Sequence, residues 1–142
     1  MDFDKVAVSK KQISGEIPMV ATEIIDGCLY SGLFGSLDSA RMAAIIDRLM
    51  STCETRGVQS VIIDLGNVDA IDSAIAGQLI HLSRILKLVG VDTIFCGINT
   101  MLAKTMVTTG VSIGDVNVVR DLKSALALYF EKTGLELVKA CK

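Results

Sequence analysis

Residues 61–80, VIIDLGNVDAIDSAIAGQLI, decide the fold of this chain. The stretch begins as a nearly unbroken apolar run rich in β-branched residues, which is typical of a strand covered on both faces. It continues to residue 89 with an apolar stripe at helical spacing, made of Ile75, Leu79, Leu82 and Leu86. Asp72 and Ser73 stand where the two patterns meet. The stretch therefore predicts a buried strand and a helix, with a polar joint between two core elements.

The residues before this stretch predict a hairpin and an amphipathic helix. Two β-like runs, at 17–25 and 28–34, are joined by Asp26-Gly27, a dipeptide typical of two-residue hairpin turns. Apolar residues between 36 and 57 recur near helical spacing, with Ser36 as the expected N-cap and Gly57 as the expected end.

The residues after this stretch continue the alternation of strands and helices. The expected elements are a strand at 91–98, a helix at 99–110, a strand at 116–121 and a helix at 122–134. Asn99 or Thr100 is the expected cap of the shorter helix, and Gly110 its end. The order ββαβαβαβα predicts an α/β fold with crossover helices, whose sheet is mixed because it opens with an antiparallel hairpin.

A single domain accounts for the chain. Its 142 residues, 51% of them hydrophobic, are enough for one ordinary core. The sequence has one proline, Pro18, and no repeated or Gly/Ser-rich segment divides it. We expect a polar N-terminal leader at 1–15, the domain at 16–133 and a C-terminal tail at 134–142.

Charge and hydropathy exclude several classes of protein. The formal net charge of -2 comes from interspersed acids and bases, so there is no basic face for nucleic acid. Segments without charged residues reach about eleven residues, whereas crossing a bilayer needs roughly twenty. The N-terminus lacks an apolar run behind its lysines, unlike a secretory signal. We expect a cytoplasmic protein that binds neither nucleic acid nor membrane.

Candidate metal ligands and catalytic pairs are sparse. Cys28, Cys53, Cys96 and Cys141 are far apart in sequence, so we expect reduced thiols, no metal and no cofactor. The one histidine, His81, is eight residues beyond Ser73 on the same expected helix, or about 12 Å at roughly 1.5 Å per residue. That distance excludes a nucleophile and its base. Phosphate-binding glycine motifs and a nucleophile elbow are also absent from the sequence.

Three aspartates form a pattern that suits an enzyme. Asp64, Asp69 and Asp72 cluster around the carboxyl end of the central strand, where α/β folds place ligands. They could hold Mg²⁺ while Asp64 accepts a phosphoryl group. No lysine ends a later strand, and turn and cap roles also suit these acids. A Mg-dependent phosphotransferase therefore stays open as an alternative.

The joint resembles a known family. A strand ending in an aspartate, a short apolar turn and D-[ST]-x-x-[AG] at a helix start are typical of STAS domains, the sulfate-transporter and anti-sigma-factor-antagonist family. The matching residues are Asp64, Val68, Ile71, Asp72, Ser73, Ala76 and Gly77. The segment LVGVDTIFCGINTMLAKTMVTTGV is similar to the stressosome scaffold and antagonist branch, and GSLDSAR at 35–41 to its R-type subunits. The resemblance covers roughly residues 17–130.

This resemblance implies a non-catalytic, phosphorylation-regulated binding protein. STAS proteins of this branch are substrates of a serine/threonine switch kinase of the histidine-kinase-like ATPase type. They hold this kinase and release it. The resemblance implies phosphorylation at Ser73 and, on the following helix, at Thr105. Other STAS stressosome subunits are the further expected partners, in a homodimer or larger assembly.

The joint also suits such a switch on physical grounds. A serine at a helix N-terminus is exposed, and the backbone amides there tolerate a phosphate. Asp72 would repel that phosphate, and Ile71, Ala74 and Ile75 are expected to form an apolar docking face. The alternative among binding modules is a ligand-binding STAS domain of a transport system.

Overall fold

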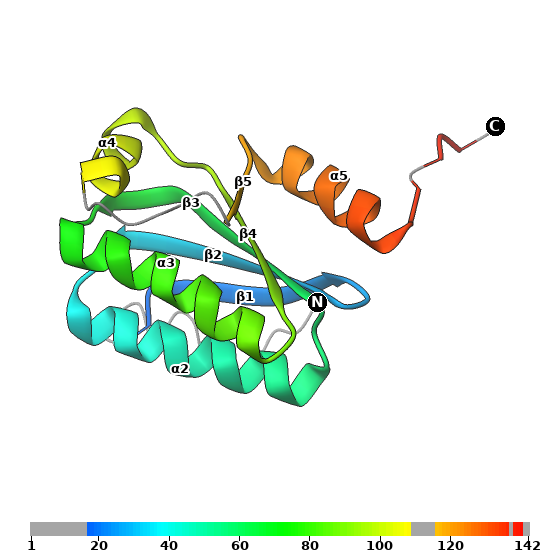
Figure 1. Cartoon of the computed structure of the whole chain (residues 1–142), viewed down its shortest axis with the longest axis horizontal. Helices are drawn as coiled ribbons and strands as arrows, with labels where there is room; N and C mark the ends of the chain where they lie inside the picture. The colour runs from blue at the N-terminus through cyan, green and yellow to red at the C-terminus, as the bar shows by residue number, and fades with distance from the viewer. Residues whose placement is uncertain (1–16, 109–115, 137, 141–142) are drawn as a thin grey trace.

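The computed structural model describes residues 17–108, 116–136 and 138–140. The elements are β1 (Met19–Ile25), β2 (Cys28–Ser36), α2 (Ser39–Arg56), β3 (Ser60–Ala70), α3 (Ser73–Leu88), β4 (Asp92–Cys96), α4 (Thr100–Thr108), β5 (Asn117–Val118) and α5 (Leu122–Thr133). In Figure 1, α2 and α3 lie side by side against the sheet, and α5 lies apart from them near β5. The expected α/β fold and the order ββαβαβαβα are confirmed.

The sheet adds each strand beside the one before it, in the order β1-β2-β3-β4-β5. β1 and β2 are antiparallel with Ile25 opposite Cys28, so Asp26-Gly27 forms the expected hairpin turn. The pairs from β2 to β5 are all parallel, and the mixed sheet is therefore confirmed. β3 extends beyond the predicted buried run, because Asn67 and Val68 continue to pair with β2 after a shift in register.

The predicted end of α2 is confirmed, and its predicted N-cap is wrong. Asp38, not Ser36, caps α2, because Ser36 still belongs to β2 and the Asp38 carboxylate accepts a hydrogen bond from the Arg41 amide at 2.8 Å. Gly57 ends α2 with φ 64, a left-handed conformation that favours glycine. Among the described helices, none is long and apolar enough to span a bilayer.

Some predictions fall partly or wholly outside the described residues. The leader at 1–15, Gly110 and Cys141 lie there, as does part of the tail. The strand expected within 116–121 is shorter than predicted, since only Asn117–Val118 pair with β4.

The two faces of the sheet form two separate cores. Val61, Ile63 and Leu65 of β3 are buried with the apolar stripes of α2 and α3. Ile62, between them in sequence, points to the opposite face and packs with Cys28, Ile94, Cys96, Ala125 and Tyr129. The Tyr129 hydroxyl donates a 2.7 Å hydrogen bond to the Asp26 carbonyl and so attaches α5 to the first hairpin turn. β3 is thus covered on both faces, as its unbroken apolar run predicts.

Burial of three thiols predicts a loss of stability at alkaline pH. Burial raises the pKa of the Cys28 and Cys53 thiols to about 11 and that of Cys96 to about 12. Unfolded thiols ionise near pH 8.5. The stability that the three buried thiols contribute is therefore complete below about pH 8.5. It falls by about 1.4 kcal/mol per pH unit for each thiol as the pH rises from there to the folded pKa, where the loss is complete.

Urea unfolding of wild type and Cys53→Ala between pH 8 and 10.5 tests this expectation. The alanine variant is less stable at pH 8 because of its cavity. Its free energy of unfolding should nevertheless fall less steeply with rising pH than that of wild type, and the two slopes should differ by the contribution of about one thiol. Equal slopes in the two proteins would contradict it.

Candidate functional site

The polar joint is the beginning of α3. Asp72 has extended backbone angles, φ -97 and ψ 179, and its carboxylate accepts a hydrogen bond from the Ile75 amide at 2.9 Å. Asp72 is therefore the N-cap, and Ser73 is the first residue of the helix. Both side chains are exposed. The serine is thus accessible to another protein at the positive end of the helix dipole.

The expected docking face needs one correction. Ile75 is only 1% exposed and belongs to the core between the sheet and the helices, so it offers no surface to a partner. Ile71 is half-buried and Ala74 is exposed. The apolar surface beside Ser73 therefore consists of Ile71 and Ala74, without Ile75.

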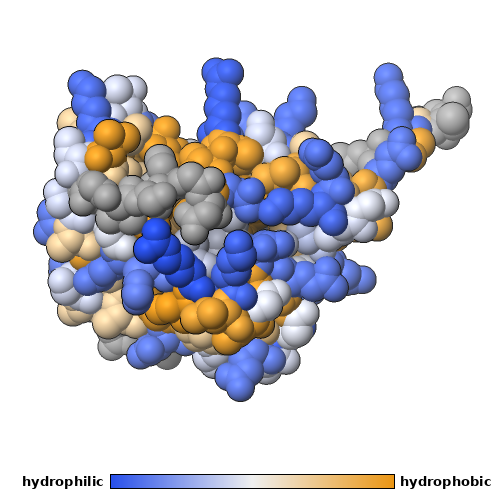
Figure 2. Space-filling view, in the orientation of Figure 1, coloured by the Kyte–Doolittle hydropathy of each residue, from blue (hydrophilic) through white to orange (hydrophobic). Residues whose placement is uncertain are grey.

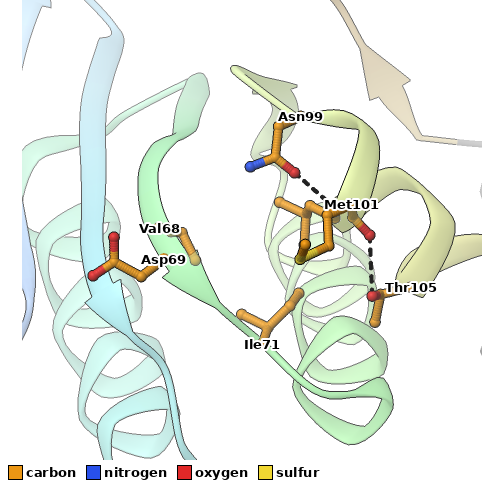
Figure 3. Close-up of a pocket in the computed structure, with 7 residues that line it drawn as sticks. Val68, Asp69, Ile71, Asn99, Met101 and Thr105 are labelled. Atoms are coloured by element: carbon orange, nitrogen blue, oxygen red, sulfur yellow. Dashed lines mark hydrogen bonds between the residues drawn. The ribbon is translucent and has the colours of Figure 1, made fainter.

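Thr105 lies on α4 near the same joint. A small hollow of about 70 Å³ separates the end of β3 from α4; its lining residues are Val68, Asp69, Ile71, Asn99, Met101, Leu102 and Thr105 (Figure 3). The Thr105 hydroxyl donates to the Met101 carbonyl at 3.1 Å, and its side chain is half-buried. The fold therefore brings Thr105 and the residues just before Ser73 to one hollow, which we call the switch hollow.

Asn99 and Met101 are among the residues of the switch hollow that were not predicted as site residues. Asn99 caps α4, with its side-chain oxygen accepting from the Leu102 amide at 2.7 Å, so the predicted cap is confirmed. Met101 follows it and is 73% exposed. An exposed methionine at a helix start is a sequence signal for an adaptable contact surface.

Asp64 is occupied by structural hydrogen bonds. Its carboxylate accepts from the Tyr30 hydroxyl at 2.7 Å and from the Gly66 amide at 2.9 Å. Burial and this bond to Asp64 raise the pKa of Tyr30 well above its usual range. Tyr30 therefore remains a neutral donor. Its hydrogen bond connects β2 to Asp64, where the part of β3 that is buried on both faces ends.

The three aspartates do not form a metal site in the described part of the chain. Asp64 is bonded to Tyr30, Asp69 lines the switch hollow, and Asp72 caps α3. Within residues 17–108, 116–136 and 138–140, no group of three or more His, Cys, Asp or Glu side chains could hold a metal ion. The geometry gives the Mg-dependent phosphotransferase no support. His81 is exposed on α3 and does not form a catalytic pair with Ser73.

A tight backbone contact joins the ends of β3 and β4. Gly97 has φ +75, and a side chain there would place its Cβ 2.5 Å from the Asp64 carboxylate and 2.7 Å from the Gly66 amide nitrogen. Only glycine fits such an approach. The segments that lead to Ser73 and to α4 are therefore held against each other at Asp64.

The comparisons with known proteins agree with this geometry. A family model described as STAS domain matches residues 19–125. The chain belongs to the STAS domain family. The STAS relatives include the RsbT co-antagonist protein RsbRD of Bacillus subtilis (strain 168), which is 27% identical over 119 residues. That match covers 84% of this chain and 43% of RsbRD, so the chain spans less than half the length of that relative.

Solved STAS structures share the fold. A serine-to-glutamate variant of RsbS from Moorella thermoacetica aligns with a TM-score of 0.72 and 17% identity, covering 82% of this chain and 98% of RsbS. The anti-sigma factor antagonist SpoIIAA in its unphosphorylated form aligns with a TM-score of 0.66 and 17% identity, covering 84% and 99%. SpoIIAA has also been solved in its phosphorylated form. The predicted likeness to stressosome and antagonist STAS proteins is confirmed.

The contact at Gly97 predicts an unequal pair of substitutions. Gly90 has nearly the same angle, φ +84, but no atom lies within 4 Å of a Cβ built there. Gly90→Ala should therefore cost only the left-handed conformation, about 1 kcal/mol, whereas Gly97→Ala should cost about 3 kcal/mol or more because backbone must also move. Urea unfolding of both variants measures the difference, and equal costs would contradict the contact at Asp64.

Proposed function

We propose that this chain is a phosphorylation-regulated protein-binding module, a stressosome-type scaffold or anti-sigma factor antagonist. It holds a serine/threonine switch kinase of the histidine-kinase-like ATPase type and releases it when Ser73 is phosphorylated. Thr105 is a second, slower site. The protein acts by changing partners and not by catalysis.

One observation carries this proposal. Ser73 is exposed at the first position of α3, and the residues that precede it share the switch hollow with Thr105. A kinase that covers Ile71 and Ala74 would contact Ser73 directly and reach the exposed Met101 beside it. The names of similar proteins, a co-antagonist and an anti-sigma factor antagonist, support the same class of role.

Phosphorylation of Ser73 would change this surface by charge. The phosphate adds about two negative charges beside the Asp72 carboxylate, which already occupies the Ile75 amide. Because both residues are exposed, salt and water screen most of their repulsion. A loss of only about 1.4 kcal/mol from the kinase interface still weakens binding tenfold.

Self-association is part of the proposal. Figure 2 shows several hydrophobic patches on the face of the molecule that it presents. Leu88 is 87% exposed and Val107 69% exposed, on α3 and α4 respectively. Such residues suit a homodimer or a larger assembly with other STAS subunits in the cytoplasm.

Substitutions at Ser73 test the proposed switch. Ser73→Ala should bind a co-purifying switch kinase and fail to release it on addition of ATP and Mg²⁺. Ser73→Glu should bind at least several-fold more weakly, although a carboxylate supplies only half the charge of a phosphate. Both should unfold within about 1 kcal/mol of wild type, because Asp72 and not Ser73 is the cap.

Calorimetric titration of the kinase and peptide mass spectrometry supply the measurements. The proposal is wrong if Ser73→Ala accepts the same stoichiometry of phosphate as wild type, or if the alanine and glutamate variants bind the kinase equally well. Failure of any kinase to co-purify with this chain would also overturn it.

Thr105 should be modified more slowly than Ser73. Its hydroxyl must leave the hydrogen bond to the Met101 carbonyl and its half-buried position before it reaches a kinase. We expect at least a tenfold lower rate in timed peptide mass spectrometry. Thr108→Ala is the matched control on the same helix, since Thr108 is exposed and lies outside the switch hollow. Equal rates at the two sites, or no phosphate at Thr105 after long incubation, would contradict this order.

A further inference from the structure

A second hollow lies at the other end of α3. Its volume is about 180 Å³, and its lining residues are Ser83, Arg84, Lys87, Asp92, Thr93, Val116, Asn117 and Lys132. These residues come from α3, β4, the start of β5 and the last turn of α5. We call it the basic hollow.

The basic hollow carries a net positive charge. Among the lining residues that the structure describes, Arg84, Lys87 and Lys132 are cations and Asp92 is an anion, which gives a formal charge of +2. Lysine in the last turn of a helix is common, because it offsets the negative end of the helix dipole. This preference accounts for the position of Lys87 on α3 and, separately, for that of Lys132 on α5. It does not explain why side chains of two helices on different faces of the sheet meet at one cavity.

A buried hydroxyl in the same hollow lacks a partner. Thr93 is 6% exposed, and its hydroxyl has no hydrogen-bond partner among the residues that the structure describes. The polar side chains beside it bond elsewhere: the Ser83 hydroxyl donates to the Ile80 carbonyl at 2.6 Å, and the Asn117 amide donates to the Thr93 carbonyl at 3.3 Å and not to the hydroxyl. A buried hydroxyl without a partner is costly, so its presence beside a cavity indicates a bound group that accepts its proton.

We propose that the basic hollow binds a doubly charged tetrahedral oxyanion, either inorganic phosphate or the phosphoryl group of a phosphate monoester. Lys87 and Lys132, in the last turns of α3 and α5, supply two positive charges for the dianion. The volume of about 180 Å³ is below the range of roughly 300–1,000 Å³ that drug-sized ligands need, so a small group fits best. Lys87 and Lys132 bind the oxyanion by charge, and Thr93 donates its hydroxyl proton to one oxygen.

This site is separate from the switch at Ser73. Lys87 lies fourteen positions beyond Ser73 on α3, or about 21 Å at roughly 1.5 Å per residue. A phosphate on Ser73 of the same chain therefore cannot occupy the basic hollow. The proposal is independent of the proposed function, and its test needs no kinase.

Titration calorimetry and thermal unfolding of the full chain test the site. The probes are sodium phosphate, glycerol phosphate and sodium chloride at constant ionic strength. The variants are the double substitution Lys87→Gln with Lys132→Gln, and Thr93→Val, which keeps the shape and removes the hydroxyl. Lys104→Gln is the matched control, because Lys104 is exposed on α4 outside the basic hollow.

We expect saturable binding of phosphate to wild type and Lys104→Gln, with at least a tenfold higher Kd for the double lysine variant. Thr93→Val should also bind more weakly, while its Tm without phosphate equals or exceeds that of wild type because a buried unpaired hydroxyl is gone. Equal binding of glycerol phosphate supports a monoester ligand, and binding of phosphate alone supports the free anion. A response to phosphate no larger than that to chloride overturns the proposal, and so does unchanged affinity in the double lysine variant.

Discussion

The hydrogen bond between Tyr30 and Asp64 lies on β3 between its fully buried part and the segment that leads to Ser73. Just upstream of Asp64, β3 is covered on both faces and carries the apolar side chains of Val61, Ile62 and Ile63. Downstream, the chain still contributes Leu65 and Val68 to one core, and it then presents Ser73 to solvent at the start of α3. Asp64 makes this change possible because Tyr30 and the Gly66 amide satisfy its carboxylate at the edge of the core. The close approach of Gly97 then fixes the next strand end against it.

This constraint gives the switch region its rigidity. The chain between Asp64 and Ser73 is held by pairing with β2, by the Asp72 cap and by the contact at Gly97. A phosphate added to such a surface changes its charge without needing to change its shape. The module is therefore suited to a switch in which partner affinity changes while the domain stays folded.

Much of the fold could be predicted from local chemistry. Asp26-Gly27 predicts its hairpin because few dipeptides suit that turn, and the apolar run of β3 predicts burial on both faces. Ser36 was the wrong cap because Ser36 and Asp38 are both good caps, and the choice depends on how far β2 extends. Ile75 belongs to the apolar stripe that predicts α3, and that signal already placed it in the core.

The parts of the site that could not be predicted depend on elements distant in sequence. The switch hollow exists because α4 packs beside the end of β3, and no pattern within either segment reveals that contact. The basic hollow likewise joins Thr93 to Lys132, which lie on different strands and helices. The hollows near the two ends of α3 therefore form only when the sheet has brought these elements together.

The bond from Tyr129 to the Asp26 carbonyl also has a consequence for synthesis on the ribosome. Its partners are 103 positions apart, and α5 contributes Ala125 and Tyr129 to the second core. While the chain emerges, Ile62 and Ile94 on that face have no helix to cover them until the last part of the domain has been translated. Between the translation of β4 and that of α5, the nascent chain therefore presents an uncovered apolar sheet face, to which chaperones that recognise such surfaces can bind.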